Sequence, residues 1–265
     1  MPQTNRNKNR VHFDFGGASV PAPTAITIPD WSTPLYHPAP HHFRDCTRVM
    51  LLCGVDEGVT RRLLPEPLEP IGDFVVVSWL LIGDVDGYQG SHNVAFNVPC
   101  RFEEHVGKFC SLEYIDIDMG LAAGREMWPW PKKGGEFTWE QTPDGLTLAC
   151  RRHGDVLVRS EITVTGEPAG AWPAGLNVPD MGQCNLQVRL LAQNHASEPE
   201  IAQVIRVDYP NSVLHGSLRA EGTLTLTDGP RDPFGPLGDI RVLAARLDTQ
   251  EFDFDLGQVV GSRRI

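Results

Sequence analysis

The sequence predicts a mainly β (α+β) fold, in which a closed or strongly curved antiparallel β-barrel-like sheet carries a few short helices. Apolar or alternating runs of strand length recur between residues 48 and 256, and Gly, Pro and Asp separate them. Only two segments have the pattern of a helix. Many strands with few helices are typical of a barrel or a large curved sheet. No linker-like stretch interrupts the chain after residue 45, so we expect a single domain over residues 46–265.

The first elements follow from apolar runs and the residues that end them. Arg48–Val55 is predicted to be a buried strand, and Asp56 is expected to cap a short helix that Pro65 must end. Phe74–Ile82 is too uniformly apolar for a half-exposed strand, so it is predicted to be central. The Asp-x-Asp-Gly pattern at Asp84–Gly87 lacks the later ligands of a calcium loop and therefore indicates a hairpin turn.

The remaining elements are mostly short strands. They are predicted at Val94–Val98, Phe109–Asp116, Phe137–Glu140, Leu146–Arg151, Val156–Thr165, Asn185–Leu191, Ile201–Val207, Val213–Thr227 and Glu251–Leu256. Asp239–Leu247 is predicted to be the second helix, with Asp239 as its cap. Residues 1–45 contain seven prolines, which favours an extended strap. His37, His41 and His42 within it could be metal ligands, but nothing nearby completes a site, so no metal is predicted.

Charge and composition exclude several classes of function. The 34 acidic and 23 basic residues give a net charge of −11, which argues against nucleic acid and anionic membranes as partners. The six cysteines have no CxxC spacing, so we expect buried free thiols. We find neither a signal-peptide core nor a run of about 18 apolar residues, and we expect a cytoplasmic protein. No Gly-x-Ser-x-Gly element indicates a serine hydrolase.

The adjacent pair Lys132-Lys133 is the most unusual feature of the chain. The sequence has four lysines, at positions 8, 108, 132 and 133, against nineteen arginines. A lysine becomes a nucleophile only as the neutral amine, which apolar surroundings and a neighbouring cation both favour. Trp128 to Pro131 supply an apolar approach, and the two glycines after the pair allow a sharp turn. The stretch therefore indicates a Schiff-base lysine, with a solvated turn as the simpler alternative.

Residues Gly124 to Lys133 resemble the nucleophile segment of the acetoacetate decarboxylase-like superfamily. That segment reads Gly-Arg-Glu, then aromatic and variable residues, then Pro-Lys-Lys, and the spacing here matches without a gap. Leu63–Leu68 is similar to an upstream family segment, and weaker similarities at Asn185–Leu191 and His215–Val260 follow in the expected order. The resemblance implies a closed, mainly β fold, a Schiff base on Lys132 that Lys133 tunes, and a homo-oligomer. No cofactor is expected.

Two positions upstream of Lys132 depart from the decarboxylases that the chain resembles. Alignment on Lys132 places Ser78 and Asn93 where two glutamates are expected, and neither residue is a carboxylate. Asn93 keeps a hydrogen-bond donor and acceptor, which suits the orientation of a carbonyl or hydroxyl group. The family arginine that handles the substrate carboxylate is expected near Arg44 and Arg48, and Arg44 is the preferred candidate.

Three further residues are candidates for the site. Glu113 shares a predicted strand face with apolar residues, so it is either a single carboxylate on a core face or a solvated strand position. Trp128 and Trp130 either wall the substrate pocket or belong to the ordinary core. A core carboxylate near the lysine would be able to transfer protons in place of the missing glutamates.

Three functions fit these residues. The first is a Schiff-base lyase acting on a small keto acid, which would be the partner molecule. Aldolase or dehydratase chemistry is favoured over decarboxylation, because an iminium is a general electron sink and the surrounding acids and bases choose the reaction. The superfamily that the chain resembles includes aldolase-dehydratases. The second function is a β-keto acid decarboxylase, and the third is a keto-ligand-binding protein without turnover.

Overall fold

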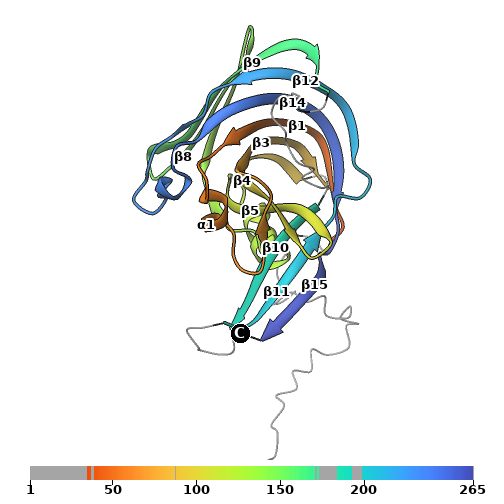
Figure 1. Ribbon diagram of the computed structural model, residues 1–265. Helices are drawn as coiled ribbons and strands as arrows, with labels where there is room; N and C mark the ends of the chain where they lie inside the picture. Colours follow the sequence, from red (N-terminus) through yellow and green to blue (C-terminus); the bar gives the residue numbers. More distant parts are fainter. Residues whose placement is uncertain are drawn as a thin grey trace, which may run out of the picture. The chain divides into compact units, whose positions relative to one another are not determined.

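One mixed sheet of 15 strands dominates the protein, in a computed structural model that describes residues 35–36, 39–86, 88–170, 172, 184–192 and 199–264 (Figure 1). The central strands are β1 (His41–Gly54), β3 (Phe74–Val85), β4 (Tyr88–Phe102), β5 (His105–Ile115) and β14 (Arg241–Phe254). Residues 35–265 form one compact unit, and residues 1–34 lie outside the described residues. Strand β1 begins at His41, inside the predicted strap.

The remaining strands extend this centre on both sides. They are β2 (Glu69–Pro70), β6 (Lys132–Gly134), β7 (Glu136–Thr142), β8 (Gly145–Arg152), β9 (Asp155–Pro168), β10 (Cys184–Ala192), β11 (Pro199–Val207), β12 (Val213–Gly222), β13 (Thr225–Leu226) and β15 (Gln258–Arg264). Every segment predicted as a strand lies wholly or mostly within one or two of these strands.

The main path of the sheet is strongly curved and has two ends. Its order is β15-β11-β10-β5-β4-β3-β1-β14-β12-β9-β8-β7. Successive strands curve side by side in Figure 1, but no pairing joins β15 to β7 in the described residues. Of the two predicted forms, the closed barrel is therefore not confirmed. Most pairs are antiparallel, as expected, whereas β5 pairs in parallel with β6 and with β10.

The central position predicted for Phe74–Ile82 is confirmed. Strand β3 pairs along its length with β1 on one side and with β4 on the other. A strand that pairs along both edges and packs on both faces has no face turned to solvent. This explains the continuous apolar sequence of β3. The predicted hairpin is also confirmed, since Val85 pairs with Tyr88 across the β3–β4 turn.

The helices differ from the predictions in three ways. Helix α1 (Val59–Leu63) follows Asp56 as expected, but its N-cap is Gly58 and no side chain caps it. The predicted helix Asp239–Leu247 is wrong, because strand β14 occupies it from Arg241 onward. Pairing with β1 on one edge and β12 on the other outweighs the helix-forming residues of that segment.

Helix α2 (Asp118–Glu126) is a second α-helix that the sequence did not indicate. It contains two glycines, Gly120 and Gly124, which lower helix propensity by about 1 kcal/mol each relative to alanine and hide the pattern. This helix carries the Gly-Arg-Glu motif and ends just before the Trp-Pro-Trp-Pro segment. It therefore decides where Lys132 lies.

The central strands bury both of their faces. On one face, here called the core face, Val77, Trp79 and Tyr114 belong to the largest hydrophobic cluster. On the other face, the cavity face, Ser78, Leu80 and neighbouring side chains line a large cavity. Because successive strand residues point to opposite faces, adjacent residues of one strand serve different purposes.

A β-bulge interrupts strand β1 near its start. The register with β14 shifts between Phe43 and Cys46, and Asp45 has a positive φ of 51°. An extra residue in a bulge reverses the alternation of side chains on either side of it. Residues before and after Asp45 therefore cannot be assigned to faces by simple counting.

Two further sequence expectations concern cysteines and membrane spans. All six cysteines are free and buried, as predicted. Within the described part of the chain, no helix has the length and apolar character needed to cross a membrane.

Candidate active site

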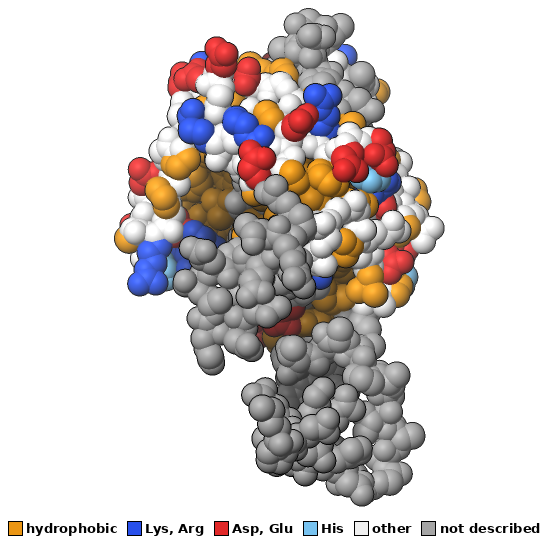
Figure 2. Space-filling view, turned by 60° about the horizontal axis from the view of Figure 1, so that its bottom comes forward, with side chains coloured by type: hydrophobic (Ala, Val, Ile, Leu, Met, Phe, Trp, Pro, Cys, Tyr) orange, Lys and Arg blue, Asp and Glu red, His pale blue; other side chains and the backbone are white. Residues whose placement is uncertain are grey.

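A cavity of about 900 Å³ lies on the cavity face of the central strands. Figure 2 shows hydrophobic side chains gathered in a hollow on one face of the molecule, while acidic and basic side chains are interspersed over the surface around it. The floor of the cavity consists of two neighbouring transverse rows of paired residues. Each row crosses several strands, so it brings together residues that are far apart in the sequence.

The first row, here called the Lys132 row, runs across six strands. From β6 to β14 its paired residues are Lys132, Glu113, Ala95, Ser78, Met50 and Arg246. All six line the cavity. The row begins at the predicted nucleophile and includes two more predicted site residues.

The second row, here called the Asn93 row, is displaced by two residues along each strand from the Lys132 row. From β5 to β14 its paired residues are Ile115, Asn93, Leu80, Arg48 and Asp248, and all five line the cavity. Asn93 is 8% exposed and lies diagonally from Glu113 across the β4–β5 pair. The structure thus brings Lys132, Glu113, Asn93 and Ser78 to one cavity floor.

Lys132 is held between a helix, a carboxylate and an indole ring. A methyl group added at Gly124 would lie 2.5 Å from both Cδ and Cε of Lys132, so the lysine stem rests directly on helix α2. Its Nζ lies 3.4 Å from Oε1 of Glu113 and 5.7 Å from the ring centre of Trp130. This close approach explains why the Gly-Arg-Glu motif begins with glycine.

The two other residues of the Gly-Arg-Glu motif make hydrogen bonds on either side of the segment that leads to Lys132. The Arg125 guanidinium donates to the carbonyl oxygen of Lys132 at 3.1 Å, and the Tyr36 hydroxyl donates to Glu126. The chain after the helix folds back, since the backbone N–H of Trp130 donates to the Gly124 carbonyl at 3.0 Å. Helix α2 and strand β6 are thereby joined into one support for Lys132.

Glu113 is the carboxylate beside Lys132. Its side chain is 7% exposed, and Lys132 is its ion-pair partner. Burial raises the pKa of Glu113 above its usual value, and the charge and hydrogen bond of Lys132 only partly oppose this. Of the two sequence interpretations of Glu113, the structure favours the single carboxylate on a packed face over the solvated position.

Lys133 points to the opposite face of the sheet from Lys132. Its Nζ lies 2.6 Å from Oδ1 of Asp232 and donates to the Arg231 carbonyl at 3.0 Å. Lys133 pairs with Tyr114, which belongs to the core face, whereas Lys132 pairs with Glu113. The structure therefore does not bring the two amines together, because strand alternation separates them.

Asp232 collects three partners on that opposite face. Besides Lys133, the Tyr114 hydroxyl donates to it at 2.9 Å, and Arg152 Nε lies 3.3 Å away. Burial alone would raise the pKa of Asp232, but the hydrogen bonds and charges of these partners lower it overall. Asp232 thus keeps its charge, and its ion pair with Lys133 holds β6 on the core face of the sheet.

Trp128 and Trp130 both line the cavity and are buried. Their ring centres lie 5.8 Å apart, and Phe254 packs against both. The Trp128 indole N–H donates to the Asp255 carbonyl at 2.7 Å. The two alternatives given by the sequence therefore coincide, since these rings belong to the packed interior and form the cavity wall.

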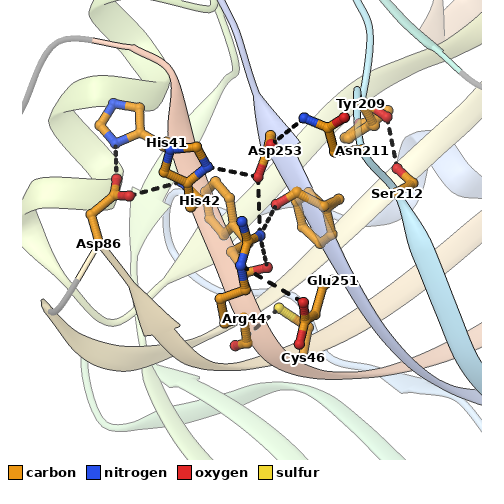
Figure 3. A network of polar contacts seen from close by, with 12 residues as sticks. His41, His42, Arg44, Cys46, Asp86, Tyr209, Asn211, Ser212, Glu251 and Asp253 are labelled. Carbon is orange, nitrogen blue, oxygen red and sulfur yellow. Dashed lines mark hydrogen bonds and ion pairs between the residues drawn. The ribbon is translucent and has the colours of Figure 1, made fainter.

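Arg44 does not line the cavity, so the structure does not support it as the carboxylate-binding arginine. It lies in a separate network, where its Nη1 is 3.0 Å from Asp253 Oδ1 and its Nε is 3.7 Å from Glu251 Oε2 (Figure 3). The bulge at Asp45 is the reason, because it places Arg44 on the face opposite to Arg48. Arg48, the alternative considered from the sequence, does line the cavity.

The histidines of the predicted strap take part in the same network rather than in a metal site. His42 Nδ1 lies 2.8 Å from Asp253 Oδ1, and His41 Nδ1 lies 3.2 Å from Asp86 (Figure 3). His37 lies outside the described residues. Among the residues that the structure describes, no group of three or more His, Cys, Asp or Glu side chains is placed to hold a metal ion.

Several cavity residues escaped sequence reasoning. Arg246 and Asp248 reach the cavity floor from β14, and Tyr209 donates to Asn185 at 2.6 Å in its wall. The segment containing Arg246 and Asp248 was predicted partly as a helix, which hides their position in the rows. Alternation along a correctly assigned β14 would have placed both side chains on one face.

Comparison with known proteins gives the family. The family model described as acetoacetate decarboxylase (ADC) matches residues 23–263. The chain belongs to this family. An acetoacetate decarboxylase from Chromobacterium violaceum is 24% identical to it over 229 residues, which cover 86% of this chain and 92% of the relative. The resemblance noted at Gly124 to Lys133 is thus confirmed across nearly the whole chain.

Solved structures share the fold of this family member. A crystal structure of acetoacetate decarboxylase from Legionella pneumophila superposes with a TM-score of 0.79 at 17% identity, covering 90% of this chain and 94% of the other. The enduracididine biosynthesis enzyme MppR, complexed with the condensation product of pyruvate and imidazole 4-carboxaldehyde, superposes with a TM-score of 0.70 at 19% identity. That match covers 94% of this chain and 98% of MppR. At these identities the likeness establishes the fold alone.

Proposed function

We propose that this protein is a Schiff-base-forming lyase in which Lys132 attacks the carbonyl carbon of a keto acid. The buried Lys132–Glu113 pair carries the proposal, with 3.4 Å between Nζ and Oε1 and side chains 10% and 7% exposed. Transfer of the ammonium proton to Glu113 converts two desolvated charges into two neutral groups, which burial favours. The neutral amine is the nucleophile that imine formation needs.

The chemistry follows from this proton transfer. The amine adds to the keto carbon, and the former carbonyl oxygen takes one proton from the amine nitrogen and a second from Glu113, so that it leaves as water and the nitrogen keeps one hydrogen. The resulting iminium on Lys132 accepts an electron pair from an adjacent bond. If the bond to a carboxylate breaks, carbon dioxide leaves. If instead a C–H bond next to the iminium breaks, its proton goes to a base and the enamine can attack an aldehyde.

The second route, aldolase or dehydratase chemistry, fits the site better than decarboxylation. It requires a base beside the iminium, and Glu113 is a carboxylate in that position with a raised pKa. Ser78 and Asn93 stand where the resemblance leads us to expect glutamates, and they offer neutral hydrogen bonds to a substrate carbonyl or hydroxyl. The structure of MppR with the condensation product of pyruvate and imidazole 4-carboxaldehyde is consistent with this route, because it shows that this fold can bind such a product.

Decarboxylation is the second candidate, and the names of the relatives favour it. It needs no base to form the enamine, because departure of carbon dioxide supplies the electron pair. In this case Glu113 would serve imine formation and hydrolysis only. Carbon dioxide release from acetoacetate therefore separates the two candidates.

Borohydride trapping tests the proposed function. Wild-type protein is reduced in the presence of pyruvate or acetoacetate, and the adduct is located by intact and peptide mass spectrometry. We expect an adduct on Lys132 that is absent from Lys132→Ala. Lys133→Ala is the matched control, because Lys133 is adjacent in sequence but faces Asp232, and it should still be labelled on Lys132.

The reaction type is then measured with the same protein. Carbon dioxide released from acetoacetate indicates decarboxylation, whereas consumption of pyruvate together with an aromatic aldehyde indicates aldol chemistry. An adduct without either turnover favours the keto-ligand-binding alternative. Failure of every keto acid to label Lys132 in folded protein would overturn the Schiff-base proposal.

A further inference from the structure

One edge of strand β5 changes its partner close to Lys132. Strand β4 pairs with the other edge along the length of β5. On the edge in question, β10 pairs in parallel with Gly107 and Lys108, and β6 pairs in parallel from Glu113 to Ile115 (Figure 1). Within the described residues, no strand pairs with this edge between those two stretches. A buried backbone N–H that points into this gap therefore needs another acceptor.

Gln187 of β10 lies in this gap. Two residues before it, Asn185 pairs with Lys108, and the same register would place Gln187 opposite Cys110. The Gln187 side chain is fully buried, and both of its neighbours here are N–H donors, which sets the amide oxygen on their side. This oxygen accepts the Cys110 backbone N–H at 2.8 Å and the Trp130 indole N–H at 3.2 Å. One amide thus joins β10 to β5 and to the segment that leads into β6.

Trp130 connects this amide to Lys132. Lys132 Nζ lies 5.7 Å from the centre of the Trp130 ring. The indole is bonded through its N–H on one side and packs on Phe254 with ring centres 5.3 Å apart, so it has little freedom to turn. Trp130 lines the cavity, whereas Gln187 lies behind the cavity wall and does not line it. Gln187 is therefore placed to affect Lys132 through Trp130 and not by contact with a substrate.

The polar residues on either side of Gln187 hold adjoining parts of the site. Side chains two apart on a strand point to the same face. Asn185 accepts the Tyr209 hydroxyl at 2.6 Å in the cavity wall. Arg189 donates to the Met127 carbonyl at 2.8 Å, directly after helix α2. This polar face of β10 thus contacts both the cavity wall and the segment between α2 and β6.

Resting on the proposed Schiff-base function, we infer that Gln187 is a positioning residue for Lys132 that acts through the Trp130 indole. Its amide oxygen holds the indole beside the lysine, and the indole keeps water away from the amine. Exclusion of water disfavours the charged form of an amine, which is the unreactive form. Loss of the acceptor should therefore slow imine formation more than it weakens binding of the keto acid.

Hydrogen exchange of the Trp130 indole N–H tests the structural part of this inference without a substrate. The chain has six tryptophans, and nuclear magnetic resonance of protein with isotope-labelled tryptophan gives each indole N–H its own signal. The signal missing from Trp130→Phe is that of Trp130. We expect Gln187→Met, which has a similar length but no amide oxygen, to raise the exchange rate of this N–H at least tenfold.

An unchanged exchange rate in Gln187→Met would show that Gln187 does not hold the indole. The wild type decides the question if this variant does not fold. Exchange of the wild-type Trp130 indole N–H as fast as that of free tryptophan would contradict the hydrogen bond to Gln187.

Borohydride labelling of Lys132 tests the functional part. The keto acid that labels the wild type is varied in concentration, and the maximal labelling rate and the half-saturating concentration are measured separately. Gln187→Met should lower the maximal rate by about tenfold, as for other small displacements around a reacting group, and change the half-saturating concentration by less than about threefold. Gln141→Met is the matched control, because Gln141 is exposed on strand β7 and should leave both quantities unchanged.

A double-mutant cycle distinguishes action through Trp130 from a general loss of packing. Trp130→Phe removes the indole N–H but keeps an aromatic ring. Adding Gln187→Met to Trp130→Phe should lower the maximal rate by less than about threefold, against about tenfold in the wild-type background, because the two residues share one interaction. The remaining effect would come from the bond to Cys110. Equal effects in the two backgrounds would overturn the action through Trp130.

The outcomes separate this inference from the function on which it rests. If the wild type is labelled on Lys132 and Gln187→Met is labelled at the same maximal rate, the positioning role is refuted and the Schiff-base function stands. If the rate falls while the exchange of the Trp130 indole N–H is unchanged, the assignment to Trp130 is wrong. If no keto acid labels Lys132 in the wild type, the proposed function fails and the positioning role fails with it.

Discussion

Two neighbouring lysines on one short strand form ion pairs of opposite character. Lys132 faces Glu113 across the cavity floor at 3.4 Å, and Lys133 faces Asp232 on the core face at 2.6 Å. Both carboxylates are buried, yet the pKa of Glu113 is raised and that of Asp232 is lowered. Burial opposes the charge in both cases, so the difference lies in the partners.

The number and closeness of partners decide which carboxylate keeps its charge. Asp232 contacts Lys133, Tyr114 and Arg152, whereas within the described residues Glu113 has Lys132 as its ion-pair partner, at a longer distance. A carboxylate with several donors is stabilised as an anion and holds structure together, whereas one with a single distant donor can exchange a proton. We therefore expect proton exchange between Lys132 and Glu113 to depend on the small number of hydrogen-bond donors that the described residues offer Glu113.

The largest expected effect comes from removing Glu113, the carboxylate that we propose accepts the proton of Lys132. Glu113→Gln should slow imine formation at Lys132 by about a hundredfold, the scale of a lost general acid–base group. In the wild type, the trapping rate should fall as acidification protonates Glu113 through its raised pKa, above the usual carboxylate range. The variant should lack this limb of the pH profile.

Stopped trapping with borohydride at several pH values measures this effect. Glu140→Gln is the control, because Glu140 is exposed on strand β7 and should leave the profile intact. An unchanged pH profile in Glu113→Gln would show that Glu113 does not exchange the proton of the reaction.

A smaller effect is expected from disturbing the contact between Gly124 and the Lys132 side chain. Gly124→Ala puts a methyl group 2.5 Å from Cδ and Cε of Lys132, which forces the lysine to move. Displacement of a reacting group by about 1 Å can cost up to a hundredfold in rate, so we expect a loss of about tenfold or more in trapping. Alanine also raises helix propensity by about 1 kcal/mol, so stability should fall little.

Gly235→Ala provides the matched control for this substitution. A methyl group at Gly235 meets nothing within 4 Å, so trapping should remain at the wild-type rate. Equal trapping rates in the two variants would mean that the position of Lys132 does not depend on contact with Gly124.

The smallest effect on trapping should come from the core face. Asp232→Asn leaves Lys133 and Arg152 without their anion and should lower the free energy of unfolding by about 3 kcal/mol, as for other broken buried pairs. Trapping at Lys132 should change less than about threefold in folded protein, because Asp232 lies on the opposite face. Chemical denaturation and trapping on the same sample measure both quantities.

Acidification adds a second measurement on this variant. The pKa of Asp232 is lowered in the folded state, so its stabilising contribution is present above the usual value of 3.8 and is lost as the pH falls through the folded-state pKa. The unfolding free energy of the wild type should therefore fall more steeply below pH 4 than that of Asp232→Asn. Parallel curves would contradict the assigned charge state of Asp232.

Most of the strands, and much of the cavity floor, could be predicted from local sequence. The four residues Lys132, Glu113, Asn93 and Ser78 all line the cavity. They could be selected from the sequence because strand alternation and the position of the family motif are local properties. The central place of β3 likewise followed from its uninterrupted apolar run. The roles assigned to these residues remain predictions for the experiments above.

The failures have specific physical causes. Arg44 was misplaced because an aspartate with positive φ at Asp45 introduces a bulge that no glycine announces. The segment of β14 was misread as a helix because its partners, β1 and β12, are far away in the sequence. Arg246 and Asp248 were missed for the same reason, since only long-range pairing brings them into the rows.

The contact between Gly124 and Lys132 has a consequence for the entropy of the proposed imine formation. A free lysine side chain loses up to about 2 kcal/mol of rotamer freedom when it is fixed. Here the stem already lies against helix α2, with Trp130 and Glu113 near its end, so folding has removed that freedom before any substrate arrives. The activation barrier for imine formation at Lys132 should accordingly contain little entropy from the nucleophile itself.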